Sequence, residues 1–134
     1  MKKTLLIAIF ILVISAPLNL FAQTTAKGIV YEDLNRNNKK EANEKGIANV
    51  AVSNGIEVVL TNSHGEYEIA VLDDTIVFVI KPSDYEYPLN TNNQPLFYYI
   101  HKPKGSPDLK YEATPATGNL PASINFGLHP TQTN

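Results

Sequence analysis

The chain has 134 residues, a formal net charge of −2 and no cysteine. This length is enough for one modest hydrophobic core but not for two. A mildly acidic chain without a basic patch is unsuited to nucleic acid, and a chain without cysteine has no disulfide framework to hold it.

The amino terminus has the three parts of a secretory signal peptide. Met1-Lys-Lys is basic, Leu5 to Ile14 is apolar, and Phe21-Ala-Gln23 offers a small-residue cleavage site. The apolar run is short for a membrane span, and a transmembrane anchor is the alternative. We expect a signal peptide over residues 1–22, export to the periplasm or the extracellular space, and no membrane span after cleavage at Ala22.

The remaining sequence predicts one antiparallel all-β domain over residues 23–128, followed by a polar tail or truncated linker at 129–134. Short β-branched and aromatic runs alternate with turn residues, and helical periodicity is absent after the signal peptide. The expected strands are Ala26–Tyr31, Val50–Ser53, Glu57–Thr61, Glu66–Ala70, Thr75–Ile80, Pro95–Ile100 and Ser123–Leu128.

Three segments carry more specific predictions. Asn54-Gly55 lies between two apolar runs and predicts a type I′ hairpin turn. Residues 75–80 do not alternate, so we expect this strand to be buried on both faces. Residues 81–88 and 101–121 are predicted loops, and the second is of a length that is uncommon in compact domains unless it has a function.

Oxygen-bearing side chains follow the first predicted strand, over residues 33–44. Asp33, Asn35 and Asn37 stand at alternate positions, and Glu41 and Glu44 occupy the ninth and twelfth positions of this loop. That spacing is typical of a twelve-residue turn that wraps oxygens around Ca²⁺, with a backbone carbonyl from position seven. We therefore expect a structural calcium site whose ligands are Asp33, Asn35, Asn37, Lys39, Glu41 and Glu44.

Position six of the loop departs from the calcium pattern. It normally needs Gly for a turn with positive φ, and here it is Asn38. Asn enters the left-handed region more readily than most residues, so the departure predicts weaker binding rather than none. The alternative is a plain solvated turn, because asparagine-rich loops with flanking charges are common.

Histidines and tyrosines supply the other candidate site residues. We expect His64 to serve its turn rather than a metal. His101 lies beside two lysines and could bind an anion, although solvated loop charge is the favoured interpretation. Four tyrosines could stack on a sugar ring or a neighbouring domain, with packing at the core and its rim favoured; they are Tyr85, Tyr87, Tyr98 and Tyr99.

Several short motifs follow one another in an order that is typical of one family. They are Gly28-Ile-Val-Tyr-Glu-Asp33, Lys45-Gly-Ile47, Val52-Ser-Asn-Gly55, Thr61 with Gly65-Glu-Tyr67, Phe78-Val-Ile-Lys-Pro82, His101-Lys-Pro-Lys-Gly-Ser-Pro107, Thr117-Gly-Asn-Leu-Pro121 and Ile124-Asn-Phe126. Together they resemble the N-terminal domain of secreted bacterial calcineurin-like phosphoesterases. The first half is also similar to the calcium-binding B-type repeats of serine-aspartate surface proteins, and more loosely to transthyretin-like modules. These resemblances imply an immunoglobulin-like or transthyretin-like antiparallel β-sandwich of about seven strands.

The resemblance implies a role beside an enzyme rather than as one. In such phosphoesterases this domain precedes a two-metal catalytic domain with motifs such as Asp-x-His and Gly-His-x-His, and none of them occurs in this sequence. We expect a non-catalytic exported accessory domain, stabilised by Ca²⁺, whose partner is a phosphoesterase domain or another exported protein. The alternative is an independent cell-surface, carbohydrate-binding or spacer module.

Overall fold

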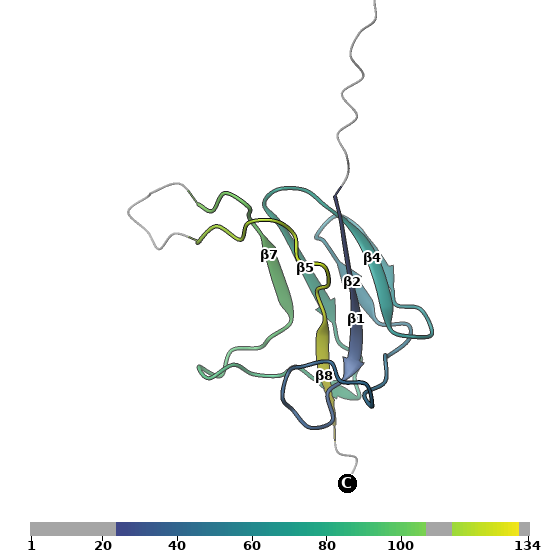
Figure 1. The fold of residues 1–134 in the computed structure, drawn as a ribbon. Helices are drawn as coiled ribbons and strands as arrows, with labels where there is room; N and C mark the ends of the chain where they lie inside the picture. The colour runs from purple at the N-terminus through teal and green to yellow at the C-terminus, as the bar shows by residue number, and fades with distance from the viewer. Residues whose placement is uncertain (1–23, 107–113, 132–134) are drawn as a thin grey trace, which may run out of the picture.

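The computed structural model describes residues 24–106 and 114–131, so the predicted signal peptide at 1–22 lies outside the described residues. Within them the chain forms two four-stranded sheets and no helix (Figure 1), which confirms the all-β prediction; there is accordingly no described helix that could cross a membrane. The strands are β1 (Thr24–Glu32), β2 (Ala51–Ser53), β3 (Val58–Leu60), β4 (Glu66–Val71), β5 (Thr75–Ile80), β6 (Tyr85–Glu86), β7 (Tyr98–His101) and β8 (Phe126–Pro130).

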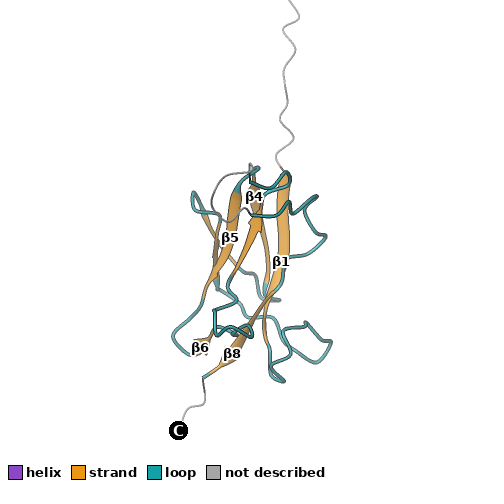
Figure 2. Ribbon diagram, turned by 90° about the vertical axis from the view of Figure 1, so that its left-hand side faces the viewer, coloured by secondary structure: helices purple, strands orange, loops and turns teal. Residues whose placement is uncertain are grey.

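One sheet has the order β4-β1-β8-β6 and the other the order β3-β2-β5-β7. Five strand pairs are antiparallel, as predicted. The exception is β1 with β8, which run parallel from Val30 opposite Phe126 to Glu32 opposite Leu128. Strand β1 is the longest, extending along most of the domain, and its second half lies beside β8 (Figure 2).

The hydrophobic core lies between the two sheets and is built by alternation along the strands. Its members are Ala26, Val30, Val50, Val52, Tyr67, Ile69, Val71, Val77, Val79, Tyr85, Ile124, Phe126 and Leu128. In β5 only the inward residues Val77 and Val79 are buried, whereas Ile76 and Ile80 are each 46% exposed. The prediction that this strand is buried on both faces was therefore wrong, because nothing described covers the outer face of its sheet.

The β2–β3 hairpin is present, but its turn differs from the prediction. Ser53 pairs with Val58, so the loop has four residues instead of two. Gly55 has φ of +86°, while Asn54 is not among the residues with positive φ. The Asn54 side-chain oxygen instead accepts the N–H groups of Ile56 and Glu57, at 2.9 and 2.8 Å. This capping of a wider loop replaces the type I′ turn.

The carboxyl-terminal strand extends further than the sequence predicts. Strand β8 continues through His129 and Pro130, where it pairs with β6, and the Thr131 N–H donates to the Asp84 carbonyl. Strand β6 lies within the predicted loop at 81–88, and its two residues leave no local signal of a strand. Residues 129 and 130 are therefore part of the sheet and Thr131 is hydrogen-bonded beside it, while 132–134 lie outside the described residues.

Candidate functional site

The predicted calcium loop joins β1 to β2 and lies at the same end of the domain as β8 (Figure 1). An isolated bridge between Tyr31 and Gly46 closes its base. The Glu32 N–H donates to the Lys45 carbonyl across the same base, at 2.9 Å. Backbone contacts alone therefore hold the two ends of the loop together.

Asp33 is fully buried, with 0% of its surface exposed. Its Oδ1 accepts the N–H of Asn37 at 3.1 Å, and its Oδ2 accepts the N–H of Asn38 at 2.9 Å. Oδ2 also accepts from Nε2 of His129 at 3.3 Å. A buried carboxylate is costly unless it is hydrogen-bonded or paired. Asp33 has three such donors, two from its own loop and one from β8 near the carboxyl terminus.

Glu44 closes the loop from its other end and is 3% exposed. Its Oε1 accepts the N–H of Leu34 at 3.2 Å, and its Oε2 accepts the N–H of Glu41 at 2.9 Å. Positions one and twelve of the predicted loop are therefore its two buried carboxylates. Each satisfies backbone N–H groups that the turn would otherwise leave without partners.

The middle of the loop is held by amide and carboxylate side chains. Asn35 and Asn37 donate their side-chain N–H groups to the two oxygens of Glu41, at 2.8 and 2.9 Å. Asn38 has φ of 59°, which confirms the left-handed turn expected at position six, and Arg36 has φ of 60°, which the sequence did not predict. The Lys39 N–H donates to Oδ1 of Asn37 at 2.8 Å.

The structure therefore brings the predicted side-chain ligands together in one hydrogen-bonded loop. Their donor atoms are oxygens, which suit a hard cation such as Ca²⁺. The oxygens of Asp33, Asn35, Asn37, Glu41 and Glu44 accept hydrogen bonds within the domain. Across residues 24–106 and 114–131, no three His, Cys, Asp or Glu side chains form a group that could hold a metal ion. The donor chemistry fits Ca²⁺, but binding would require the amides of Asn35 and Asn37 to leave Glu41.

His129 is the member of this site that sequence reasoning missed. It was placed in a polar tail, yet it lies in β8, is 9% exposed, and contacts the buried carboxylate of Asp33. A sequence signal for this longer strand would be apolar residues that continue to alternate beyond Leu128, but the residues that follow are mostly polar. The contact joins the loop after the first strand to the last strand.

Tyr31 forms one wall of the site. Burial, together with the nearby carboxylates of Asp33, Glu44 and Glu41, raises its pKa from 10.0 to about 12. The ammonium group of Lys40 lies 5.9 Å from the centroid of its ring. Tyr31 therefore stays neutral across the pH range in which an exposed tyrosine ionises.

Tyr31 predicts a loss of stability at alkaline pH. The unfolded tyrosine ionises near pH 10 while the folded one stays neutral, so its contribution is complete below pH 10 and is lost as the pH rises from about 10 to about 12. Urea unfolding near pH 9 and near pH 11 should show this fall, and Tyr31→Phe should reduce it. Tyr98→Phe, at a half-exposed tyrosine, is the matched control; an equal reduction there would contradict the assignment.

Two other tyrosines confirm the packing interpretation. Tyr85 is buried and donates its hydroxyl to Oε1 of Glu32 at 2.6 Å. Burial, then this hydrogen bond, raises its pKa. Tyr87 donates to the Val79 carbonyl at 3.1 Å and accepts the Lys81 N–H at 3.2 Å.

His101 was predicted to be a solvated loop residue, and this was wrong. It is the last residue of β7 and is 5% exposed, and its Nδ1 has no partner among the described residues. The following segment is ordered at its base, where Lys102 donates its N–H to Thr117 Oγ1 at 2.9 Å. The Nζ of Lys102 forms an ion pair with Asp74 at 3.2 Å, so this ammonium group is already paired and is not free to bind an anion. Residues 107–113 lie outside the described residues.

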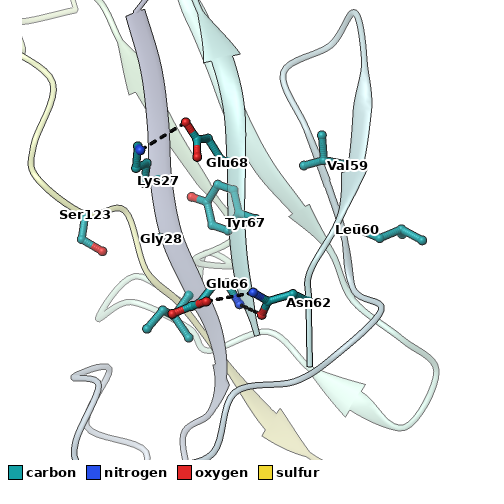
Figure 3. Close-up of a pocket in the computed structure, with 10 residues that line it drawn as sticks. Lys27, Gly28, Val59, Leu60, Asn62, Glu66, Tyr67, Glu68 and Ser123 are labelled. Atoms are coloured by element: carbon teal, nitrogen blue, oxygen red, sulfur yellow. Dashed lines mark hydrogen bonds and ion pairs between the residues drawn. The ribbon is translucent and has the colours of Figure 1, made fainter. Parts of the chain in front are cut away.

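His64 lies in the predicted turn, where its N–H donates to Asn62 Oδ1 at 2.9 Å. A hollow of about 450 Å³ opens near this turn, along β1 and β4 (Figure 3). Its charged and amide groups pair with one another: Lys27 with Glu68 at 3.2 Å, and Asn62 with Glu66 at 2.8 Å. The hollow therefore has little to offer a polar ligand.

The comparisons with known proteins give one finding. A family model described as the N terminal of calcineurin-like phosphoesterase matches residues 34–115, which is more than half of the chain. The matched region begins within the candidate loop and extends past β7. No curated protein matches the chain.

Proposed function

The chain belongs to the family of N-terminal domains of calcineurin-like phosphoesterases, and from this membership we propose that it is an exported, non-catalytic accessory domain that stabilises a phosphoesterase domain. The family match carries the proposal. The sequence supports the non-catalytic part, because the two-metal motifs of such enzymes are missing from it. The basic, apolar and small-residue regions at the amino terminus support export.

The test is a pair of proteins that differ in the accessory domain alone. A calcineurin-like phosphoesterase domain from the same genome is expressed with and without this chain joined to it. The joined form should keep its activity on heating to a temperature several degrees higher, because a domain that binds only the folded state stabilises it. Equal inactivation temperatures would contradict a stabilising role.

We also propose that the 33–44 loop binds Ca²⁺ as a structural ion. Its support is the ligand spacing in the sequence, the all-oxygen donor set, and the left-handed Asn38 at position six. The resemblance to calcium-binding B-type repeats points the same way. The ion would be held by Asp33, Asn35, Asn37, the Lys39 carbonyl, Glu41 and Glu44, and it would replace the Glu41–amide hydrogen bonds with ionic contacts.

Calcium should raise the melting temperature of the purified domain. An ion at one hundred times its dissociation constant adds about 2.7 kcal/mol to the stability of the folded state, which corresponds to roughly 10 °C for a domain of this size. Glu41→Gln should abolish most of this response, whereas Glu86→Gln, at an exposed carboxylate of β6, should leave it unchanged. Identical melting curves in Ca²⁺ and EDTA would contradict the calcium proposal.

A further inference from the structure

A second hollow lies between β8 and the segment that leads into β7. Its volume is about 390 Å³, which is within the range of about 300 to 1,000 Å³ that is usual for small-molecule sites. Three segments that are far apart in the sequence line it, namely the 33–44 loop, residues 88–99 and residues 121–127. We call it the tyrosine hollow, because Tyr98 and Tyr99 form one of its walls.

The walls of the tyrosine hollow are aromatic and uncharged. None of the described residues that line it has a charged side chain. Such a site offers no counter-charge for a desolvated phosphate or carboxylate, so it suits a neutral ligand. Tyr98 is 51% exposed, and a tyrosine side chain combines an apolar ring face with a polar tip. The hollow therefore has an accessible flat surface for a ligand that is itself partly apolar.

Amide and hydroxyl groups of the tyrosine hollow are available to a ligand. Oδ1 of Asn125 accepts the Ile29 N–H at 3.0 Å, which fixes this side chain. Nδ2 of Asn125 has no hydrogen-bond partner among the described residues. The same holds, within the described part of the chain, for the side-chain amide of Asn38 and the hydroxyl groups of Tyr98 and Tyr99. Amide and hydroxyl groups together supply both donors and acceptors.

The main chain adds a buried donor at Gly127. The Leu128 carbonyl accepts the Asp33 N–H, and the Ile124 N–H donates to the Lys27 carbonyl, so alternate residues of this stretch bond to β1. The backbone groups of Gly127 point the other way, toward the hollow that this residue lines. Gly127 is buried, and its N–H has no partner within residues 24–106 and 114–131. Buried N–H groups without a partner are rare, and a ligand oxygen in the hollow would satisfy this one.

Pro88 explains why this edge of β8 is open. Among the described residues, β6 pairs with β8 at His129 and Pro130. Shortly after β6 the chain reaches Pro88, which lines the hollow and has no N–H with which to continue the ladder. The open edge at residues 125–127 is at the short end of the usual strand length of about 3 to 10 residues. A peptide added as a further strand would therefore find few partners, which favours a compact ligand.

Asn38 connects the tyrosine hollow to the 33–44 loop. Its φ of 59° lies in the region where glycine has no steric cost. Glycine at this position would suit the backbone but would remove an amide from the hollow. Asparagine therefore accepts a small backbone cost and supplies a polar group to the site. Asn93 also has φ of 59° and is not among the residues that line the hollow, so the two asparagines form a matched pair.

We propose that the tyrosine hollow binds one neutral sugar ring of an oligosaccharide. A sugar ring presents C–H groups on its faces and hydroxyl groups around its edge, which matches an aromatic wall with amides beside it. The ring stacks on Tyr98, its hydroxyl groups bond the amides of Asn38 and Asn125, and one of its oxygens accepts the Gly127 N–H. This binding is additional to the accessory role and does not depend on it.

Amide NMR spectra of the purified chain test the site directly. The probes are maltose, cellobiose, lactose and N,N′-diacetylchitobiose, with glucose 6-phosphate as the charged control. We expect at least one neutral disaccharide to shift the Gly127 N–H and the side-chain amides of Asn38 and Asn125 in a saturable manner. Glucose 6-phosphate should leave them in place, because the hollow has no counter-charge.

Two variants should weaken this binding, and one should not. Asn38→Gly keeps the backbone turn and removes one hydrogen-bonding group, so it should raise the dissociation constant about fivefold. Tyr98→Ala removes the stacking surface and should have an effect of about the same size. Asn93→Gly makes the same change as Asn38→Gly outside the hollow and should leave the dissociation constant unchanged. The spectra of the free variants show whether each one folds, and Asn38→Gly suffices if Tyr98→Ala does not.

Three results would overturn the proposal. The first is the absence of a saturable shift with any of the four disaccharides. The second is a set of shifts confined to residues outside the hollow, or an equal loss of affinity in Asn38→Gly and Asn93→Gly. The third is a saturable shift of the Gly127 N–H with an acetylated and amidated alanine peptide but with no sugar, which would assign the open edge of β8 to strand addition.

Discussion

Replacing Asp33 with alanine is expected to lower the free energy of unfolding by about 4 kcal/mol, because three buried hydrogen-bond donors lose their acceptor at a cost of about 1 to 3 kcal/mol each. The change leaves the N–H groups of Asn37 and Asn38 and the ring nitrogen of His129 without their acceptor in a region that water reaches poorly. Urea denaturation in EDTA measures the loss, so that the hydrogen bonds are tested apart from any metal.

Two further variants make the Asp33 result specific. Asp33→Asn keeps one acceptor oxygen and should cost about half as much. Asp73→Ala, at an exposed carboxylate in the β4–β5 turn, should change the stability by less than about 0.5 kcal/mol. If Asp33→Ala were as mild as Asp73→Ala, the contact between the loop and β8 would have no role in holding the fold.

Gly28→Ala is expected to cost about 3 kcal/mol, near the upper end for overpacking a core. A Cβ at Gly28 would lie 1.8 Å from the Ile124 carbonyl oxygen, which is main chain and cannot rotate away. The Ile124 N–H donates to the Lys27 carbonyl at 2.8 Å, so the segment that leads into β8 is held directly against β1. Thermal melting should show the loss as a lower midpoint.

Gly55→Ala separates crowding from backbone strain. Gly55 has φ of +86°, and nothing lies within 4 Å of its added Cβ. It should therefore cost only the conformational penalty of about 1 kcal/mol. Equal losses for Gly28→Ala and Gly55→Ala would mean that the close approach of β1 to Ile124 is not what requires glycine at position 28.

Local patterns predicted every described strand except β6, and the reason is visible in the burial of the strands. Strand β4 alternates between exposed Glu66 and Glu68 and buried Tyr67 and Ile69, as its sequence suggests. The parallel pairing of β1 with β8 joins residues almost one hundred positions apart. No short-range pattern reports such a contact, because register between distant strands depends on the whole packing arrangement.

The candidate loop was predictable only in its short-range part. The alternation of Asp33, Asn35 and Asn37 fixes a tight turn, because these side chains bond nearby N–H groups. The partner of Asp33 across the domain, His129, was not predictable from its polar surroundings. Likewise the apolar run of β5 indicated a central strand, which it is, but could not show that no described segment covers one side of its sheet.

We propose above that this chain supports phosphoester chemistry without performing it. The direct measurement is the initial rate of p-nitrophenyl phosphate hydrolysis by the purified chain, with Mn²⁺, Zn²⁺ or Ca²⁺ added, beside the joined phosphoesterase as a positive control. We expect no rate above buffer at any chain concentration. A metal-dependent rate that increases in proportion to the chain, and persists after a further purification step, would contradict it.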